Sequence, residues 1–135
     1  MSRSHVLFMC VANSARSQMA EGLARHHAPA GVTIYSAGSE PSKVRQQAIE
    51  VMAELDIDIA GHWSKGVADV PAEKIDTVIT LCAEEVCPVF PGQVERLDWG
   101  LPDPAGHEDE PWEAQLTRFR VARDAIRARV LDLFG

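Results

Sequence analysis

Short apolar runs alternate along the chain with longer segments in which apolar residues recur every three or four positions. The runs, rich in β-branched residues, predict strands at 5–9, 32–36, 75–81 and 94–99. The helical spacing predicts helices at 14–27, at 42–55 and from 109 or 110 to the last residues. Prolines and glycines mark the segments between them as loops, and 56–66 is expected to be irregular.

Strands separated by helices of this length predict βαβ units. We therefore expect an α/β fold in which residues 1–135 form one domain, with a four-stranded parallel sheet and helices on both faces. Right-handed crossovers limit the order of the strands. Ligands of such sheets bind at the carboxyl ends of the strands, beside the point where the strand order reverses. The segments that directly follow strands are therefore the places to look for a functional site.

Composition excludes several classes of protein. With 46% apolar residues among 135, the chain can bury a core, and its net charge of −7 argues against a nucleic-acid partner. No apolar run approaches the ~20 residues of a membrane span, and the first residues lack the features of a secretory signal, so we expect no membrane partner. Three cysteines, an odd number, do not make a disulfide framework, which favours a cytoplasmic protein whose thiols are available for chemistry.

The first candidate site joins the first strand to the first helix. It consists of Cys10, Val11, Ala12, Asn13, Ser14, Ala15, Arg16 and Ser17. Small residues let successive backbone N–H groups point inward and form an anion-binding nest at the start of a helix. Arg16 can close that nest with a planar fork that fits a tetrahedral oxyanion, and the same positive surroundings favour the thiolate form of Cys10. Ser14 or Ser17 could donate a hydrogen bond to the sulfur, and Asn13 could brace the loop.

A purely structural interpretation of the same segment competes with this one. In it, Cys10 is an inert buried thiol at the end of a strand and Ser14 is an ordinary helix cap. An isolated Cys and Arg five residues apart would favour that interpretation. Here the Cys-x5-Arg-Ser pattern lies at a strand-to-helix junction, which favours an anion-binding and nucleophilic role.

Two more cysteines follow the strongest predicted strand. Parallel neighbours bring the ends of the first and third strands to one edge of the sheet, so Cys82 can lie near Cys10. Four residues separate Cys82 from Cys87, which permits the Cα separation of about 7 Å or less that a disulfide requires. The alternatives are inert thiols or a zinc site shared with a His or with Cys10. Structural zinc sites have tighter Cys spacing, so we predict no metal site.

The segment at 10–17 resembles the phosphate-binding loop of the low-molecular-weight tyrosine phosphatase fold, and more closely that of the thioredoxin-coupled arsenate reductases built on it. The similarity is carried by Cys10-x-x-Asn13-Ser14-x-Arg16-Ser17, Gln-Met-Ala-Glu-Gly at 18–22, Ser-Ala-Gly at 36–38 and Asp-Pro-Ala-Gly at 103–106. It extends over essentially the whole chain.

This resemblance implies that arsenate is reduced to arsenite by three catalytic cysteines. Cys10 would attack arsenic, Cys82 would attack the sulfur of Cys10, and Cys87 would then attack Cys82. The segment between Cys82 and Cys87 is shorter than in the family pattern, which bears on how far this loop must unwind. Asp103 would protonate the departing oxygen. Taken alone, Asp103-Pro104 would be an ordinary turn.

This series of thiol attacks, the three-cysteine relay, requires no bound cofactor, because the formation of one disulfide supplies the two electrons that As(V) takes. It requires an external dithiol: thioredoxin is expected, with glutaredoxin or a low-molecular-weight thiol as the alternative. A phosphatase for aryl phosphates or phosphotyrosine and a non-catalytic arsenite-binding module remain alternative functions. Tyrosine phosphatases of this fold place aromatic residues beside the acid, whereas Tyr35 is the single tyrosine here. Residues 62–65 are expected to form a surface turn, or else to add positive charge near the site.

Overall fold

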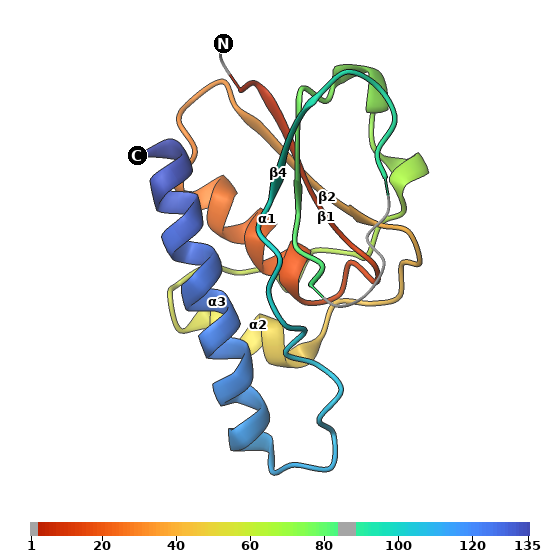
Figure 1. Cartoon of the computed structure of the whole chain (residues 1–135). Helices are drawn as coiled ribbons and strands as arrows, with labels where there is room; N and C mark the ends of the chain where they lie inside the picture. The colour runs from red at the N-terminus through yellow and green to blue at the C-terminus, as the bar shows by residue number, and fades with distance from the viewer. Residues whose placement is uncertain (1–2, 84–88) are drawn as a thin grey trace.

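The computed structural model of the chain describes residues 3–83 and 89–135. Within them, a parallel sheet has the strand order β2-β1-β3-β4 (Figure 1). The strands are β1 (His5–Cys10), β2 (Thr33–Gly38), β3 (Thr77–Thr80) and β4 (Glu95–Asp98). The helices are α1 (Arg16–His27), α2 (Gln46–Ala53) and α3 (Trp112–Phe134), with two short 3-10 helices, η1 (Val67–Asp69) and η2 (Ala72–Lys74). The predicted strands and helices are therefore all present, and the α/β parallel architecture is confirmed.

The order of the strands fixes where a site can form. β1 pairs with β2 on one side and with β3 on the other, so that Cys10 lies opposite Gly38 and Met9 lies opposite Thr80. The chain leaves β1 through α1 to reach β2, and then returns across the sheet to β3. The strand order therefore reverses at β1, and Cys10 lies at its carboxyl end.

Both faces of the sheet are covered, but by different kinds of element. Val6 and Phe8 of β1 pack with α1, α2 and α3 in one cluster, on the side where Figure 1 shows all three helices. Leu7 and Met9 point to the opposite face, where they pack with Val67 of η1, with Val70 and Ile75 directly after η1 and η2, and with loop residues that include Phe90. Burial on both faces explains why β1 is a continuous apolar run. The predicted helices on both faces thus divide into three α-helices on one side and short 3-10 helices on the other.

All three α-helices begin later than the sequence pattern predicts, and α3 begins at Trp112 rather than 109 or 110. α1 begins at Arg16 rather than 14, because the residues between Cys10 and Arg16 form a loop. α2 begins at Gln46 rather than 42, because residues 40–45 are hydrogen-bonded to that loop instead of to a helical turn. In the part of the chain that the structure describes, no helix is long and apolar enough to cross a membrane.

Candidate active site

The loop between β1 and α1 is held in place by the segment that follows β2. Three backbone N–H groups of that segment donate hydrogen bonds to carbonyl oxygens of the loop: Glu40 to Val11 (2.9 Å), Ser42 to Ala12 (3.1 Å) and Arg45 to Ser14 (3.0 Å). These carbonyl oxygens are thus turned toward residues 40–45. An anion-binding nest requires this arrangement, with the loop's carbonyls facing outward and its N–H groups facing the pocket.

Gly38 and Asn13 meet the steric demands of this loop. A Cβ atom at Gly38 would lie 2.3 Å from the carbonyl oxygen of Val11 and 2.9 Å from the backbone nitrogen of Asn13, so no larger residue fits. Asn13 has a φ of 48°, in the left-handed region that Asn tolerates better than most residues. The similarity at 36–38 thus has a physical basis, because the glycine lets the loop approach β2.

Cys10 is a free thiol with 3% of its surface exposed. Its Sγ lies 2.9 Å from Oγ of Ser17 and accepts a hydrogen bond of 3.3 Å from the backbone N–H of Asn13. The cap of α1 is Ala15, with no side-chain capping bond, so the interpretation of Ser14 as a helix cap is wrong. Of the two serines considered, Ser17 is the one that contacts the sulfur. The sulfur of Cys10 is therefore held by the hydroxyl of Ser17 and by a backbone N–H of the loop.

Arg16 connects the loop to the segments that follow β3 and β4. Its side chain is 4% exposed, and Nη1 donates to the carbonyl oxygens of Leu81 (3.0 Å) and Leu101 (2.9 Å). Nη2 lies 3.7 Å from Oδ2 of Asp103, whose side chain is 48% exposed. Oδ1 of Asp103 accepts the N–H of Ala105 at 3.0 Å, so the residue makes an ordinary Asx turn and also reaches Arg16.

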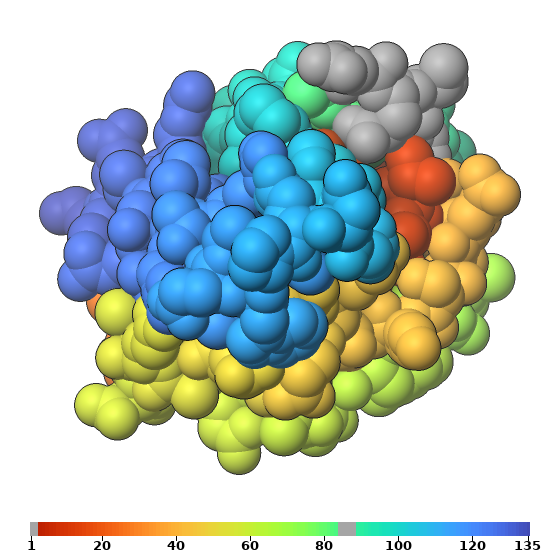
Figure 2. All heavy atoms as spheres, turned by 90° about the horizontal axis from the view of Figure 1, so that it is seen from below, coloured from red at the N-terminus to blue at the C-terminus, as the bar shows by residue number. Residues whose placement is uncertain are grey.

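A pocket of about 170 Å³ opens in front of the loop. It is lined by Cys10, Val11, Ala12, Ser14, Ala15, Arg16 and Asp103. The other two predicted loop residues, Asn13 and Ser17, are fully buried and hydrogen-bond to Cys10 instead. Figure 2, viewed toward the carboxyl ends of the strands, shows the red surface of the β1–α1 segment between the gold surface after β2 and the blue surface before α3. Among the described residues, the lining contains no aromatic side chain, and the hydroxyl of Tyr35 lies 3.2 Å from Nδ1 of His5 instead.

Cys82 lies at the same edge of the sheet as Cys10. The N–H of Leu81 donates to the carbonyl of Met9 at 2.9 Å, which extends the β1–β3 pairing to the residue before Cys82. Cys82 is buried and disulfide-bonded, whereas Cys10 is free, so no bond joins these two sulfurs. The prediction for Cys87 lies outside the described residues. Concerning the zinc alternative, no group of three or more His, Cys, Asp or Glu side chains in residues 3–83 and 89–135 is placed to hold a metal ion.

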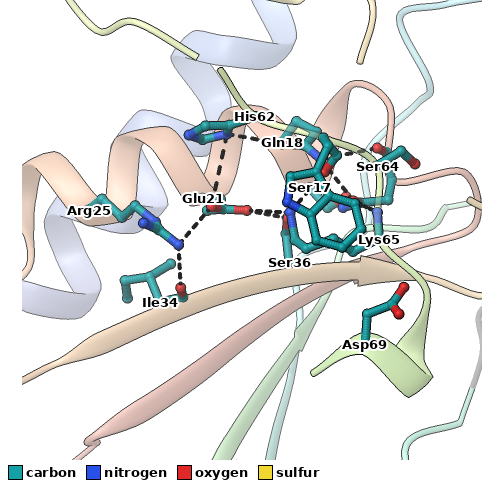
Figure 3. A network of polar contacts seen from close by, with 12 residues as sticks. Ser17, Gln18, Glu21, Arg25, Ile34, Ser36, His62, Ser64, Lys65 and Asp69 are labelled. Carbon is teal, nitrogen blue, oxygen red and sulfur yellow. Dashed lines mark hydrogen bonds and ion pairs between the residues drawn. The ribbon is translucent and has the colours of Figure 1, made fainter. Parts of the chain in front are cut away.

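Residues 62–65, expected at the surface, support the loop from behind. The backbone N–H of Lys65 donates to Oδ1 of Asn13 at 2.7 Å, and the hydroxyl of Ser64 donates to the carbonyl of Ala12 at 2.9 Å. Nζ of Lys65 lies 3.3 Å from Oε1 of Glu21, so its positive charge is paired inside the protein (Figure 3). The segment lies at the surface, where Trp63 is 59% exposed, and it also completes the hydrogen bonding of the loop.

Glu21 is the centre of the charges behind the loop. Its carboxylate is 3% exposed, accepts a hydrogen bond from the hydroxyl of Ser36, and lies 2.9 Å from Nη2 of Arg25. Nδ1 of His62 lies 3.9 Å away (Figure 3). Burial lowers the pKa of His62 below its ordinary value, and this outweighs the opposing effect of Glu21. Sequence reasoning did not identify this cluster.

Comparisons with known proteins agree with this geometry. The family model described as low molecular weight phosphotyrosine protein phosphatase matches residues 5–134. An arsenate reductase of Staphylococcus xylosus is 40% identical over 132 residues, 96% of this chain and 95% of that protein. The solved structure of an arsenate reductase from Archaeoglobus fulgidus has a TM-score of 0.82 at 32% identity, over 96% of this chain and 98% of that one.

A thioredoxin-dependent arsenate reductase of Corynebacterium glutamicum has a TM-score of 0.74 at 30% identity, over 97% of this chain and 60% of that one. An arginine phosphatase with a TM-score of 0.70 and 18% identity shares the fold alone. Because the family match covers nearly the whole chain, and relatives above 30% identity align over almost all of it, the chain belongs to the low molecular weight phosphotyrosine protein phosphatase family.

Proposed function

We propose that this chain is an arsenate reductase that acts through Cys10, Cys82 and Cys87. The observation that carries the proposal is the position of Cys82, directly after Leu81, whose carbonyl accepts a hydrogen bond from Arg16 of the oxyanion loop. A phosphatase on this fold needs only the first cysteine. A second cysteine at the same edge of the sheet, next to a residue that is hydrogen-bonded to Arg16, is what a reductase needs in addition.

In the first step, the pocket binds arsenate and Cys10 attacks arsenic. The loop N–H groups and Arg16 bind the oxyanion, and the contacts with Ser17 and Asn13 hold the sulfur of Cys10 in place for the attack. Asp103, which lines the pocket, donates a proton to the departing oxygen, so that water leaves and an arsenic–sulfur bond forms.

In the second step, the thiolate of Cys82 attacks the sulfur of Cys10. A disulfide forms and the arsenic–sulfur bond breaks, with its electron pair remaining on arsenic. Arsenic is thereby reduced from As(V) to As(III), two thiolates are oxidised to one disulfide, and arsenite leaves. Cys87 then attacks Cys82, which regenerates the Cys10 thiolate and leaves a Cys82–Cys87 disulfide.

Thioredoxin is the proposed reductant of that last disulfide. Cys10 is 3% exposed in a narrow pocket, which a protein dithiol cannot enter, so the oxidation has to be carried to other sulfurs before thioredoxin can act. The likeness to a thioredoxin-dependent arsenate reductase supports this partner over glutaredoxin or a small thiol. The proposal includes a cytoplasmic location, where a reducing system keeps the three thiols available.

The two other candidate functions have weaker support. The family description favours a phosphatase, but within residues 3–83 and 89–135 no aromatic side chain lines the pocket to hold a phenyl ring. An arsenite-binding module would use the three thiolates without turnover. The buried Arg16 and the acid beside it are unnecessary for that role.

The deciding experiment couples arsenate to NADPH through thioredoxin and thioredoxin reductase. The proposal predicts one NADPH oxidised and one arsenite formed for each arsenate, and no NADPH oxidation when phosphate replaces arsenate. Replacing thioredoxin with glutaredoxin and glutathione should slow turnover strongly. Hydrolysis of p-nitrophenyl phosphate without arsenate-dependent NADPH oxidation would establish a phosphatase, and tight arsenite binding without turnover would establish a binding module.

A further inference from the structure

The segments that follow β3 and β4 run side by side beyond the ends of the two strands (Figure 1). The N–H of Leu101, after β4, donates to the carbonyl oxygen of Leu81, after β3, at 3.4 Å. The residues next to these two along the chain, Gly100 and Cys82, also meet. They meet through their backbones, so the residue type at position 100 decides how closely the backbone of Cys82 can approach.

Gly100 leaves a space that a side chain would fill. A Cβ atom at this position would lie 2.7 Å from the carbonyl oxygen of Cys82 and 3.6 Å from Cα of Ala83. A carbon and an oxygen that are not bonded to each other do not approach so closely, and this oxygen belongs to the backbone and not to the end of a flexible side chain. Any residue other than glycine at position 100 therefore requires the backbone to move.

The backbone on the β4 side of this contact is fixed. Trp99 is buried, and its ring packs against that of Phe8 with the two centroids 5.7 Å apart. The carbonyl of Leu101 accepts a hydrogen bond of 2.9 Å from Arg16. Both neighbours of Gly100 along the chain are thus held in place, so the segment after β4 cannot give way.

On the β3 side, Leu81 is fixed as well. Its N–H donates to the carbonyl of Met9 at 2.9 Å, and its own carbonyl accepts a hydrogen bond of 3.0 Å from Arg16. A side chain at position 100 would therefore displace the peptide group between Cys82 and Ala83, which contains the oxygen at 2.7 Å. Such a displacement changes the backbone geometry of Cys82 itself.

We propose that Gly100 is a positioning residue for Cys82, because its bare backbone makes the space that the carbonyl of Cys82 occupies while this cysteine is in its disulfide. Cys82 is disulfide-bonded in the structure, so the contact belongs to the oxidised form. A disulfide holds the Cα atoms of its two cysteines within about 7 Å and so restricts the backbone on either side of them. Once the disulfide is reduced, the peptide group after Cys82 can turn away from position 100.

Gly100 thus favours the disulfide of Cys82 over the two thiols. This inference deepens the proposed function and rests on it only in taking Cys82 as the second thiol. In the proposed reaction, the disulfide that thioredoxin reduces contains Cys82. A side chain at position 100 would oppose the formation of that disulfide, and it would leave the pocket in front of Cys10 as it is, because Gly100 does not line the pocket.

The first test uses the unmodified protein, with and without its disulfide. In the oxidised form, one Hα of Gly100 points toward Ala83 in the direction of the missing Cβ, and NMR should show a nuclear Overhauser effect between these two residues. After reduction by dithiothreitol the effect should weaken. An effect of equal strength in both forms would show that the contact does not depend on the disulfide, and would contradict the proposal.

The second test measures the equilibrium between the protein and dithiothreitol, which passes two electrons and two protons to the disulfide and itself becomes a cyclic disulfide. Free thiols are blocked at equilibrium, and the labelled fraction of Cys82 is read by mass spectrometry. In Gly100→Ala, the equilibrium constant should move toward the two thiols by about tenfold, because the added methyl group overpacks the oxidised form. An unchanged constant would overturn the proposal.

The matched control is Gly22→Ala. A Cβ at Gly22, on α1, would lie 2.8 Å from Cγ2 of Ile59 and 3.1 Å from Cε of Met52, so this variant is also strained by a short contact, but one that does not involve Cys82. It should keep the wild-type equilibrium with dithiothreitol. An equal shift in the two variants would show that the effect of Gly100→Ala is a general loss of packing, and would contradict the proposal.

The last measurement shows whether Gly100→Ala acts through Cys82 or through the oxyanion pocket. Inorganic phosphate should protect Cys10 from iodoacetamide equally well in the variant and in the wild type, whereas arsenate turnover with thioredoxin should slow. Loss of phosphate protection would show that the substitution disturbs Arg16, and would overturn the proposal. The NMR, dithiothreitol and phosphate measurements need no arsenate, so a failure of the proposed function is distinguishable from a failure of this inference.

Discussion

Nη1 of Arg16 lies 3.0 Å from the carbonyl oxygen of Leu81, the residue directly before Cys82. The guanidinium that faces the oxyanion pocket is therefore also attached to the backbone that carries the second cysteine. A movement of Cys82 toward Cys10 has to change this hydrogen bond. In the proposed reaction, the attack by Cys82 and the loss of the bound oxyanion are thus linked through one side chain.

The three cysteines should differ in which of two activities, arsenate reduction and phosphate ester hydrolysis, depends on them. Cys10→Ser should abolish both arsenate reduction and any slow hydrolysis of p-nitrophenyl phosphate, because both need the same nucleophile. Cys82→Ser and Cys87→Ser should lose reductase turnover with thioredoxin but keep the hydrolysis, since water, not a thiol, resolves a phosphocysteine. Full reductase turnover by Cys87→Ser with thioredoxin would contradict the role of a third thiol.

Asp103→Asn should lower kcat for arsenate roughly 100-fold or more while KM changes little. An amide cannot supply a proton, whereas the loop and Arg16 still bind the oxyanion. The matched control is Asp58→Asn, because Asp58 also accepts the N–H of the residue two positions later, that of Ala60 at 2.8 Å, but lies outside the pocket. A similar loss of kcat in both variants would show that Asp103 serves only its turn.

Local pattern was sufficient to predict the strands, the helices and the loop at 10–17. β1 is recognisable because both of its faces are buried, which makes all six of its residues apolar except His5. The helix predicted at 42–55 was too long by four residues at its start. Local spacing cannot reveal that the N–H groups of Ser42 and Arg45 are used by a loop some 30 residues earlier.

The support behind the loop could not be predicted for the same reason. Asn13 and Lys65 are 52 positions apart, and the hydrogen bond between them uses the backbone of Lys65, which has no signature in sequence. The positions of two polar residues on α1 did indicate that such support was needed. Gln18 and Glu21 stand on a helix whose residues from Arg16 to Ala24 are all buried, so both side chains needed buried partners.

Gly38→Ala should destabilise the protein by about 2 kcal/mol or more and impair arsenate reduction. The added Cβ would meet the backbone of Val11 at 2.3 Å, and neither strand β2 nor the loop can move without breaking its hydrogen bonds. Gly61→Ala is the control, since no atom lies within 4 Å of the position that a methyl group would take there. That change should stay within about 0.5 kcal/mol in urea unfolding. Equal effects of the two substitutions would contradict the close approach at Gly38.

Stability should fall on acidification partly through His62. Burial lowers the pKa of His62 from 6.5; Arg25 and Lys65 act in the same direction, and Glu21 and Asp58 oppose them. The folded protein therefore binds this proton less readily than the unfolded chain does. The contribution to stability is complete above about pH 6.5 and is lost as the pH falls below that value.

The variant that tests this dependence is His62→Asn, which removes the titrating group. Its free energy of urea unfolding should vary less between pH 7.5 and pH 5 than that of the wild type. Parallel curves for the two proteins would show that protonation of His62 does not contribute to the pH dependence of the free energy of unfolding.

The most direct test of the three-cysteine relay is a map of the disulfides after a single turnover. Fully reduced protein is mixed with arsenate in the absence of any reductant, free thiols are blocked, and the linked peptides are identified by mass spectrometry. We expect one arsenite released per protein molecule and Cys82 linked to Cys87, with Cys10 again a free thiol. Arsenite release without a disulfide, or a dominant Cys10–Cys82 link that persists in the final product, would contradict the relay.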